Sequence, residues 1–372
     1  MPENILNVLC SIGTRPEVIK MAPVVWKIRQ QKNMRVTVII TAQHRQLIDD
    51  VLTLFNIQPD FDLNIMQENQ SLSTLTGNLF LKLEPLIDKD KYDIVLAQGD
   101  TTTTLVTAQI SFYKKIPFGH IEAGLRTYNF RNPFPEEMNR VFISKLSDIH
   151  FAPTDLERKI LENENINSSA IYVTGNTVID ALYYWAEKNT PLPFSLPENK
   201  KIILLTLHRR ESFGAPMQNI FSALLELVKK HDDIHIIYPV HPNPNINKMA
   251  YEMLDQHPSI SLIKSLAYDK FVTLMKHAYL ICTDSGGLQE EAPALNKPLI
   301  VLRDETERPL VVSLGLARLG GTNKNSVLSS IESLVSDIDL YRQMQKNISP
   351  YGDGHAAERI VQVIKEKIKP HY

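Results

Sequence analysis

The 372-residue chain has only two cysteines, no excess of positive charge and no long apolar run. Cys10 and Cys282 lie in short apolar runs in opposite halves of the chain, which predicts buried core thiols and neither a disulfide nor a metal site. With 40 Lys and Arg against 42 Asp and Glu, the net charge of −2 leaves no general basic surface for nucleic acid or a membrane. The chain has neither a signal-peptide pattern nor a bilayer-spanning run, so we expect cytoplasmic residence.

Common cofactor motifs are also missing. The sequence has no G-x-x-x-x-G-K-[ST] loop for a triphosphate, no H-E-x-x-H and no clustered Cys or His ligands, so we expect neither a cofactor nor a metal. The run Gly352-Asp353-Gly354-His355-Ala356-Ala357 loosely resembles a dinucleotide fingerprint, but it lies near the C-terminus instead of after a first strand. A nicotinamide site there is therefore not expected.

Strand-like apolar runs alternate with helix-length amphipathic runs along the whole chain. Uninterrupted apolar strands between helices indicate parallel sheets covered on both faces, and two such sets predict an α/β fold with two Rossmann-like doubly wound domains. The expected strands are 5–12, 36–41, 94–97, 118–121, 149–152, 171–173, 202–206, 234–240, 260–263, 279–283 and 299–302. We expect domains at 1–174 and 175–355, a Pro-rich boundary loop near 189–199, and a C-terminal helix, 356–372, that packs back on the first domain.

Polar motifs follow the strands. Ligands of open parallel sheets bind beyond the carboxyl ends of the strands, so carboxylates, a histidine and arginines converging there predict a catalytic cleft between the domains. Singly, each residue has a simpler explanation: Lys20 suits an ion pair with Glu17, and Arg15 a solvated loop. The motifs are Gly13-Thr14-Arg15-Pro16-Glu17, Gln98-Gly99-Asp100 before four threonines suited to donate at a helix start, Glu122-Ala123-Gly124-Leu125-Arg126, His208-Arg209-Arg210-Glu211 and His241-Pro242-Asn243.

Two helix starts are ambiguous. The stretch Asp284-Ser285-Gly286-Gly287 predicts backbone N–H groups that can hold phosphate, with Glu291 about two turns into the helix and able to reach a ribose. It equally suits an ordinary helix capped by Asp284 or Ser285. Glu136, which follows Pro135, suits either a catalytic carboxylate or simple complementation of the helix dipole.

In order and spacing, these motifs and Asn176-Thr177 resemble those of the bacterial non-hydrolysing UDP-N-acetylglucosamine 2-epimerases, from Gly13 to the turn at 351–354. The resemblance implies two glycosyltransferase-B type domains, a homodimer, and reversible conversion of UDP-GlcNAc to UDP-ManNAc for a cell-surface polysaccharide pathway. The C2 hydrogen of the sugar is not adjacent to a carbonyl, so direct deprotonation is unfavourable. The remaining route without a redox cofactor eliminates UDP to a 2-acetamidoglucal and adds it back.

The resemblance also implies roles for individual residues. Proton transfer falls to the carboxylates Asp100, Glu122 and Glu136, with the face of the sugar that each serves left open. Nucleotide contacts fall to His208, Arg15 and Lys20 at the diphosphate, Ser285, Gly286 and Gly287 at a phosphate, Glu291 at the ribose, Phe271 at uracil, and Arg308, which moves toward the nucleotide on closure. Phe271 is also consistent with a helix core residue.

A second UDP-GlcNAc activates some relatives. The positions that hold it match Gln43, His44, Gln46, Arg210 and His241, although residues 43–46 are equally consistent with a helix cap. Some activated relatives have an arginine where this chain has Asn69, so we expect weaker activation.

Two further positions depart from the family pattern. Leu207 replaces a small residue and is expected to add bulk to the cleft floor, and Leu310 replaces a glutamate that contributes to closure. Three alternatives remain: a hydrolysing epimerase, whose relatives usually replace the proline present here as Pro16, a glycosyltransferase of the same fold, and a silent nucleotide-sugar sensor.

Overall fold

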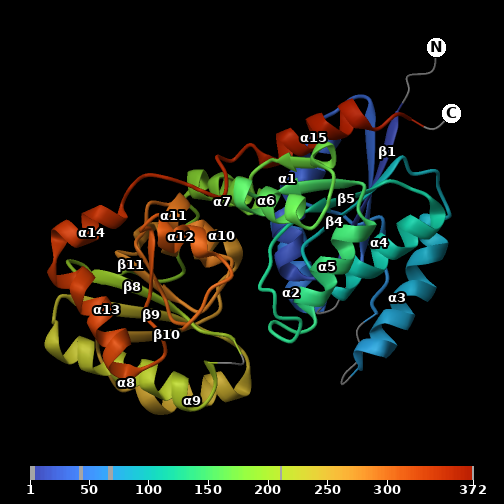
Figure 1. The fold of residues 1–372 in the computed structure, drawn as a ribbon. Coiled ribbons are helices and arrows are strands. Elements are labelled where there is room, and N and C mark those ends of the chain that lie inside the picture. The colour runs from blue at the N-terminus through green and yellow to red at the C-terminus, as the bar shows by residue number, and fades with distance from the viewer. Residues whose placement is uncertain (1–4, 42–44, 66–69, 210–211, 371–372) are drawn as a thin grey trace. The chain divides into compact units, whose positions relative to one another are not determined.

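The computed structural model describes residues 5–41, 45–65, 70–209 and 212–370, leaving out the side chains of residues 45–47 (Figure 1). The chain divides into two compact units. Unit 1 comprises Met1–Tyr183 and Tyr351–Tyr372, and unit 2 comprises Tyr184–Pro350.

Unit 1 is built on a seven-stranded parallel sheet with the order β3-β2-β1-β4-β5-β6-β7. The order reverses between β1 and β4, the point where ligands bind in doubly wound folds. The strands are β1 (Leu6–Ile12), β2 (Met34–Ile40), β3 (Phe61–Asp62), β4 (Ile94–Gln98), β5 (Phe118–Ile121), β6 (Ile149–Ala152) and β7 (Ile171–Val173).

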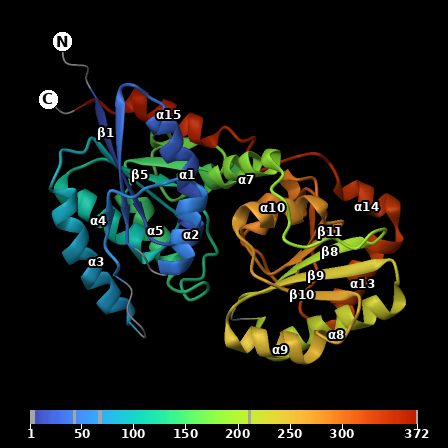
Figure 2. The same ribbon diagram turned by 180° about the vertical axis from the view of Figure 1, so that it is seen from behind.

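Helices cover both faces of this sheet. Helices α3, α4 and α5 contribute apolar side chains to one buried cluster with β1, β4 and β5. Helix α1 packs against α2 and α15, and Figures 1 and 2 show α1 and α15 side by side from opposite views. The helices are α1 (Arg15–Arg29), α2 (Arg45–Leu54), α3 (Leu72–Ile87), α4 (Thr102–Lys114), α5 (Glu136–Leu146), α6 (Asp155–Asn163), α15 (Ala356–Lys367) and the short 3₁₀ turn η1 (Ser168–Ala170). Helix α7 (Thr177–Lys188) begins in unit 1 and, from Tyr184 on, belongs to unit 2.

Unit 2 repeats the same architecture with six parallel strands in the order β10-β9-β8-β11-β12-β13. Helices α8, α9 and α13 share one large apolar core with β8 and β9. The strands are β8 (Lys201–Thr206), β9 (Ile234–Val240), β10 (Ile260–Lys264), β11 (Leu280–Thr283), β12 (Leu299–Val301) and β13 (Ala317–Leu319). The helices are α8 (Ala215–Lys230), α9 (Pro244–Leu254), α10 (Tyr268–His277), α11 (Leu288–Ala294), α12 (Pro309–Ser313), α13 (Lys324–Ser336) and α14 (Ile338–Met344).

The predicted fold class, two Rossmann-like doubly wound sheets, is confirmed, and all eleven expected strands are present with small differences at their ends. Strands β3 and β13 were not predicted, because each is short and contains a charged residue, Asp62 or Arg318, that interrupts the apolar pattern. Both cysteines are buried, as predicted. Leu207, expected to bulk a cleft floor, is instead 1% exposed within the apolar core of unit 2.

The bounds of the units differ from the expected 174/175 and 355/356 because the start of α7 packs on the turn before α15. The backbone N–H of Asn176 donates to Tyr351 O at 2.6 Å, and Asp180 accepts from the N–H groups of Ala356 and Ala357 at 3.1 and 2.8 Å. These contacts place both segments in unit 1. Within the described part of the chain, no helix is both long and apolar enough to cross a membrane.

Candidate active site

Glu122 lies directly after β5 and is buried in unit 1. Its backbone has a φ of 67°, a left-handed conformation that is costly for a residue with a side chain. Its carboxylate forms a buried ion pair with Lys20 of α1, and Nδ2 of Asn176 donates to Oε2 at 2.9 Å. The simpler explanation of the sequence paired Lys20 with Glu17. In the structure, Lys20 pairs with Glu122 instead.

Glu17 instead organises the turn between β1 and α1. It completes a capping box with Thr14, and its Oε2 accepts from the backbone N–H groups of Gly13 and Thr14 at 2.7 and 2.5 Å. Its Oε1 accepts from the hydroxyls of Thr101 and Thr104. Burial raises the pKa of Glu17, and the hydroxyl and backbone donors oppose that rise. The threonine run thus supports a buried carboxylate.

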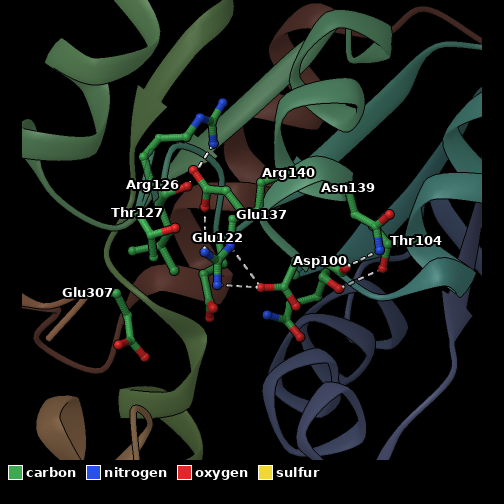
Figure 3. Close-up of polar contacts among 12 residues, drawn as sticks. Asp100, Thr104, Glu122, Arg126, Thr127, Glu137, Asn139, Arg140 and Glu307 are labelled. Atoms are coloured by element: carbon green, nitrogen blue, oxygen red, sulfur yellow. Dashed lines mark hydrogen bonds and ion pairs between the residues drawn. The ribbon is translucent and has the colours of Figure 1, made fainter. Parts of the chain in front are cut away.

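The turn after β4 places Asp100 against α5 (Figure 3). Nε and Nη2 of Arg140 lie 2.8 and 2.7 Å from Oδ2 of Asp100. Arg140 also bonds Glu137, one turn earlier in the helix, at 2.9 Å. Glu136, the first residue of α5, is half-buried, whereas its neighbour Glu137 is fully buried.

His120 holds the turn after β4, which carries Asp100. Its Nε2 lies 2.7 Å from Gly99 O, and because a carbonyl only accepts, this nitrogen carries the proton. Burial lowers the pKa of His120 to about 4, so the ring is neutral at neutral pH.

In unit 2, Asp284 is a fully buried acceptor at the end of β11. It receives the backbone N–H groups of His208 and Arg209 and the hydroxyl of Ser212 at 2.9 to 3.1 Å, and it lies 3.1 Å from Nδ1 of His208. Burial opposes the charge, but the contacts with His208 and Arg209 outweigh it and lower the pKa of Asp284. The expectation that Asp284 or Ser285 caps α11 is wrong, since the helix begins after Gly287.

Glu291 lies in the first turn of α11, not two turns into it as expected. Its Oε1 accepts from the hydroxyl of Tyr268 at 2.7 Å, which fixes the carboxylate. Phe271, three residues beyond Tyr268 on α10, is half-buried.

A cluster of arginines surrounds Glu307 in unit 2. Arg209, Arg303 and Arg308 each contact its carboxylate at 2.6 to 2.9 Å. Burial alone would raise the pKa of Glu307, but the three guanidinium groups hold it far below its usual range. Arg308 also bonds Glu290 at 2.6 Å, and a Cβ added at Gly286 would lie 2.6 Å from the Arg308 guanidinium. A side chain at 286 would therefore displace the ends of Arg308 and Glu307.

The family model for UDP-N-acetylglucosamine 2-epimerase matches residues 26–365, which is most of the chain. The chain belongs to the UDP-N-acetylglucosamine 2-epimerase family. The UDP-N-acetylglucosamine 2-epimerases of Yersinia pestis and Escherichia coli K12 are 47% and 46% identical to it over 370 and 371 residues, covering 97% of this chain and 98% of each relative.

Solved structures of this epimerase family agree. The UDP-GlcNAc 2-epimerase of Neisseria meningitidis bound to UDP-GlcNAc has a TM-score of 0.93 and 44% identity, covering 97% of this chain and all of that one. The Methanocaldococcus jannaschii epimerase in complex with UDP-GlcNAc and UDP has a TM-score of 0.83 and 32% identity, with the same coverage.

Within each unit, the residues that the resemblance to the 2-epimerases singles out gather at the carboxyl ends of adjacent strands. Unit 1 holds Asp100, Glu122, Arg15 and Lys20 there, with Glu136 at the start of α5, and unit 2 holds His208, His241, Ser285, Gly286, Gly287, Glu291 and Arg308. The rings of His208 and His241 stack with centroids 6.2 Å apart. Gln43, His44 and Arg210 lie outside the described residues, as does the side chain of Gln46.

Several supporting residues were not predicted from the sequence, above all Glu137, Arg140 and His120. The i, i+3 spacing of Glu137 and Arg140 was a visible signal of an ion pair, but the contact with Asp100 joins residues 40 positions apart. Among the described residues, no group of three or more His, Cys, Asp and Glu side chains could hold a metal ion.

Proposed function

We propose that this chain is a non-hydrolysing epimerase that interconverts UDP-GlcNAc and UDP-ManNAc. The observation that carries the proposal is the pair of anchored carboxylates, Asp100 and Glu122, at the ends of the neighbouring strands β4 and β5. The first is held by Arg140 and the second by Lys20 and Asn176. Family membership and a solved relative bound to UDP-GlcNAc support the choice of substrate.

The proposed reaction is an elimination followed by a re-addition. A carboxylate removes the proton from C2, the electron pair forms the C1–C2 double bond, and the bond from C1 to the diphosphate oxygen breaks. UDP then adds back to C1 of the 2-acetamidoglucal while a carboxylic acid protonates C2 on the opposite face. Positioned acid–base groups of this kind each contribute roughly 10²- to 10⁴-fold to a rate.

The remaining residues would bind the nucleotide. Lys20 and Arg15 at the start of α1 and His208 after β8 would stabilise charge on the departing diphosphate. In unit 2, the N–H groups at Ser285, Gly286 and Gly287 would contact phosphate, Glu291 the ribose and Phe271 the uracil. Arg308, already fixed by two carboxylates, would exchange part of that pairing for the nucleotide.

Incubation of the purified chain with UDP-GlcNAc in D₂O tests the proposal. We expect partial conversion to UDP-ManNAc with one solvent deuteron at C2, without added NAD or metal, because the proton removed at C2 exchanges with solvent before re-protonation. NMR and mass spectrometry of the nucleotide sugars measure it. Retention of the original hydrogen at C2, or a requirement for a nicotinamide, would contradict the mechanism.

The same incubation separates the proposed reaction from each of the three alternatives. A hydrolysing epimerase releases free N-acetylmannosamine and UDP, a glycosyltransferase leaves UDP-GlcNAc unchanged without an acceptor, and a sensor changes nothing. We favour the non-hydrolysing reaction because Pro16 is intact in the first turn of α1.

We also propose that the chain forms a homodimer through the outer faces of α3, α4 and α5. Leu81, Phe112, Tyr113 and Phe142 are 76, 61, 64 and 51% exposed, and the rings of Phe80 and Tyr113 stack with centroids 6.4 Å apart. Exposed apolar patches of this kind commonly mark protein interfaces. Multi-angle light scattering distinguishes the dimer from a monomer.

Cytoplasmic residence and supply of a polysaccharide pathway remain predictions.

Allosteric activation by a second UDP-GlcNAc is a further proposal, involving Gln43, His44, Gln46, Arg210 and His241. A ligand that prefers one conformation shifts the enzyme toward it, and the lack of an arginine at Asn69 is expected to weaken the effect. The reverse reaction, started from pure UDP-ManNAc, should begin with a lag that a trace of UDP-GlcNAc shortens. A full initial rate without a lag or stimulation would exclude an obligatory activator.

A further inference from the structure

Arg140 holds the side chain of Asp100 through one carboxylate oxygen, by a hydrogen bond from Nε and a close ion-pair contact from Nη2. Nε and Nη2 of its guanidinium lie 2.8 and 2.7 Å from Oδ2, and the arginine is only 7% exposed. A planar guanidinium that contacts a carboxylate through two of its nitrogens restricts it more than a single contact from a flexible ammonium does. Asn139, the preceding residue, donates from Nδ2 to Asp100 O at 2.8 Å. Helix α5 therefore fixes both the side chain and the main chain of Asp100.

Glu137 holds the other side of the guanidinium. Its Oε2 lies 2.9 Å from Nη1 of Arg140, and its Oε1 accepts from the backbone N–H of Tyr128 at 2.8 Å. The Glu137 side chain is fully buried, so it has no room to turn away from these partners. Burial opposes the charge on Arg140, but Asp100 and Glu137 raise its pKa above the ordinary value. The group between the two carboxylates therefore stays cationic.

We propose that Arg140 and Glu137 are positioning residues for the carboxylate of Asp100 during proton transfer at C2. The inference rests on the proposed epimerase function and adds two residues to it. Figure 3 shows the arrangement, with Arg140 between Asp100 and Glu137. Glu137 orients the guanidinium of Arg140, and Arg140 orients the carboxylate of Asp100. Neither residue is required to touch the substrate.

The geometry distinguishes the two adjacent glutamates of α5. Glu136 is the residue that the family resemblance places at the sugar, and it is half-buried at the start of the helix. Glu137 is buried and committed to Arg140 and Tyr128. Substitution of Glu137 should therefore act only through the position of Asp100.

The test compares steady-state epimerisation by Arg140→Ala, Arg140→Lys and Glu137→Gln with the wild-type chain. A misplacement of about 1 Å at a catalytic group can cost about 10²-fold in rate, so we expect Arg140→Ala to lose about 10²-fold in kcat. We expect the KM for UDP-GlcNAc to change little, because this cluster lies outside the proposed nucleotide contacts. Arg140→Lys and Glu137→Gln should fall between wild type and Arg140→Ala.

Chemical rescue separates positioning from folding. Added guanidinium should restore part of the kcat of Arg140→Ala, whereas a general loss of structure would not respond. The matched control is Arg158→Gln, which removes a half-exposed arginine paired with Glu162 on α6 and should leave kcat unchanged. Circular dichroism reports whether each variant folds.

Near-normal kcat in Arg140→Ala, or a loss expressed only in KM, would overturn the proposal. If Arg140→Ala does not fold, Arg140→Lys and Glu137→Gln decide the question, and normal kcat in both would equally overturn it. A wild-type chain that fails to epimerise UDP-GlcNAc would instead refute the proposed function, a result that the variants cannot mimic.

Discussion

Asp100→Asn, Glu122→Gln and Glu136→Gln should each lower turnover by roughly 10²- to 10⁴-fold, the usual contribution of a positioned acid or base. An amide keeps the shape of the carboxyl group but can neither accept the C2 proton nor return it. At Glu122 the change also leaves Lys20 without the carboxylate that pairs with it. At least one variant should release UDP and the 2-acetamidoglucal, because elimination can continue when re-addition is impaired.

Turnover is measured with UDP-GlcNAc, and nucleotide binding is measured separately by calorimetry with UDP. Glu252→Gln, an exposed position on α9 paired with Lys248, is a control expected to behave like wild type. If all three carboxylate variants kept near-normal turnover and bound UDP normally, the assignment of the carboxylates would be wrong.

Acid should destabilise unit 1 through two buried histidines. The pKa of His120 is lowered from 6.5 to about 4 and that of His150 to about 3, in both cases chiefly by burial. A depressed pKa means that the unfolded chain takes up protons first, so stability is complete above pH 6.5 and is lost as the pH falls toward 4. At 1.36 kcal/mol per pKa unit, protonation of His120 alone lowers the free energy of unfolding by roughly 3 kcal/mol.

Structure explains why protonation is unfavourable. Nε2 of His120 already donates to Gly99 O, and Nδ1 has no partner among the described residues. A proton on Nδ1 would be an unsatisfied buried donor. His150 pairs with His120 in the register of β5 and β6, so a charge on one ring disfavours a charge on the other.

The stability of unit 1 can be measured directly by tryptophan fluorescence, because the chain has two tryptophans, Trp26 in unit 1 and Trp185 in unit 2. In a Trp185→Phe background, fluorescence during urea unfolding reports unit 1 at pH values from 7 to 4.5, above most carboxylate titrations. His150→Phe should flatten the pH dependence, and His355→Gln, an exposed control, should not. A free energy of unfolding independent of pH across this range would show that the rings titrate normally.

The sequence was sufficient to predict the sheets and the side chains at their edges. Strands such as 94–97 and 299–301 have uninterrupted apolar patterns, and the parallel arrangement within each sheet brings the carboxyl ends of its strands together. The sequence alone therefore places Glu122 and Asp100 at one edge of the sheet.

Partners of these side chains could not be predicted, because long-range contacts leave no local pattern. Glu17 suited an ion pair with Lys20 by spacing, yet it accepts from the threonines after β4, whereas Lys20 pairs with a residue 102 positions away. Asp284 suited a helix cap but lies buried beneath the turn after β8. In each case, burial and hydrogen bonding across the sheet outweighed the local preference.

The contact between Asn176 and the turn before α15 bears on the order in which the molecule assembles during synthesis. The side chain of Asn176 holds Glu122, and its backbone N–H bonds Tyr351, a residue that the ribosome adds only after all of unit 2. Domains generally fold as they emerge, starting from the N-terminus. A nascent chain that ends within unit 2 therefore has its first sheet and the Glu122 carboxylate but lacks the segment that completes the support of Asn176. The Glu122 carboxylate therefore reaches its final position only after the rest of the chain has been made.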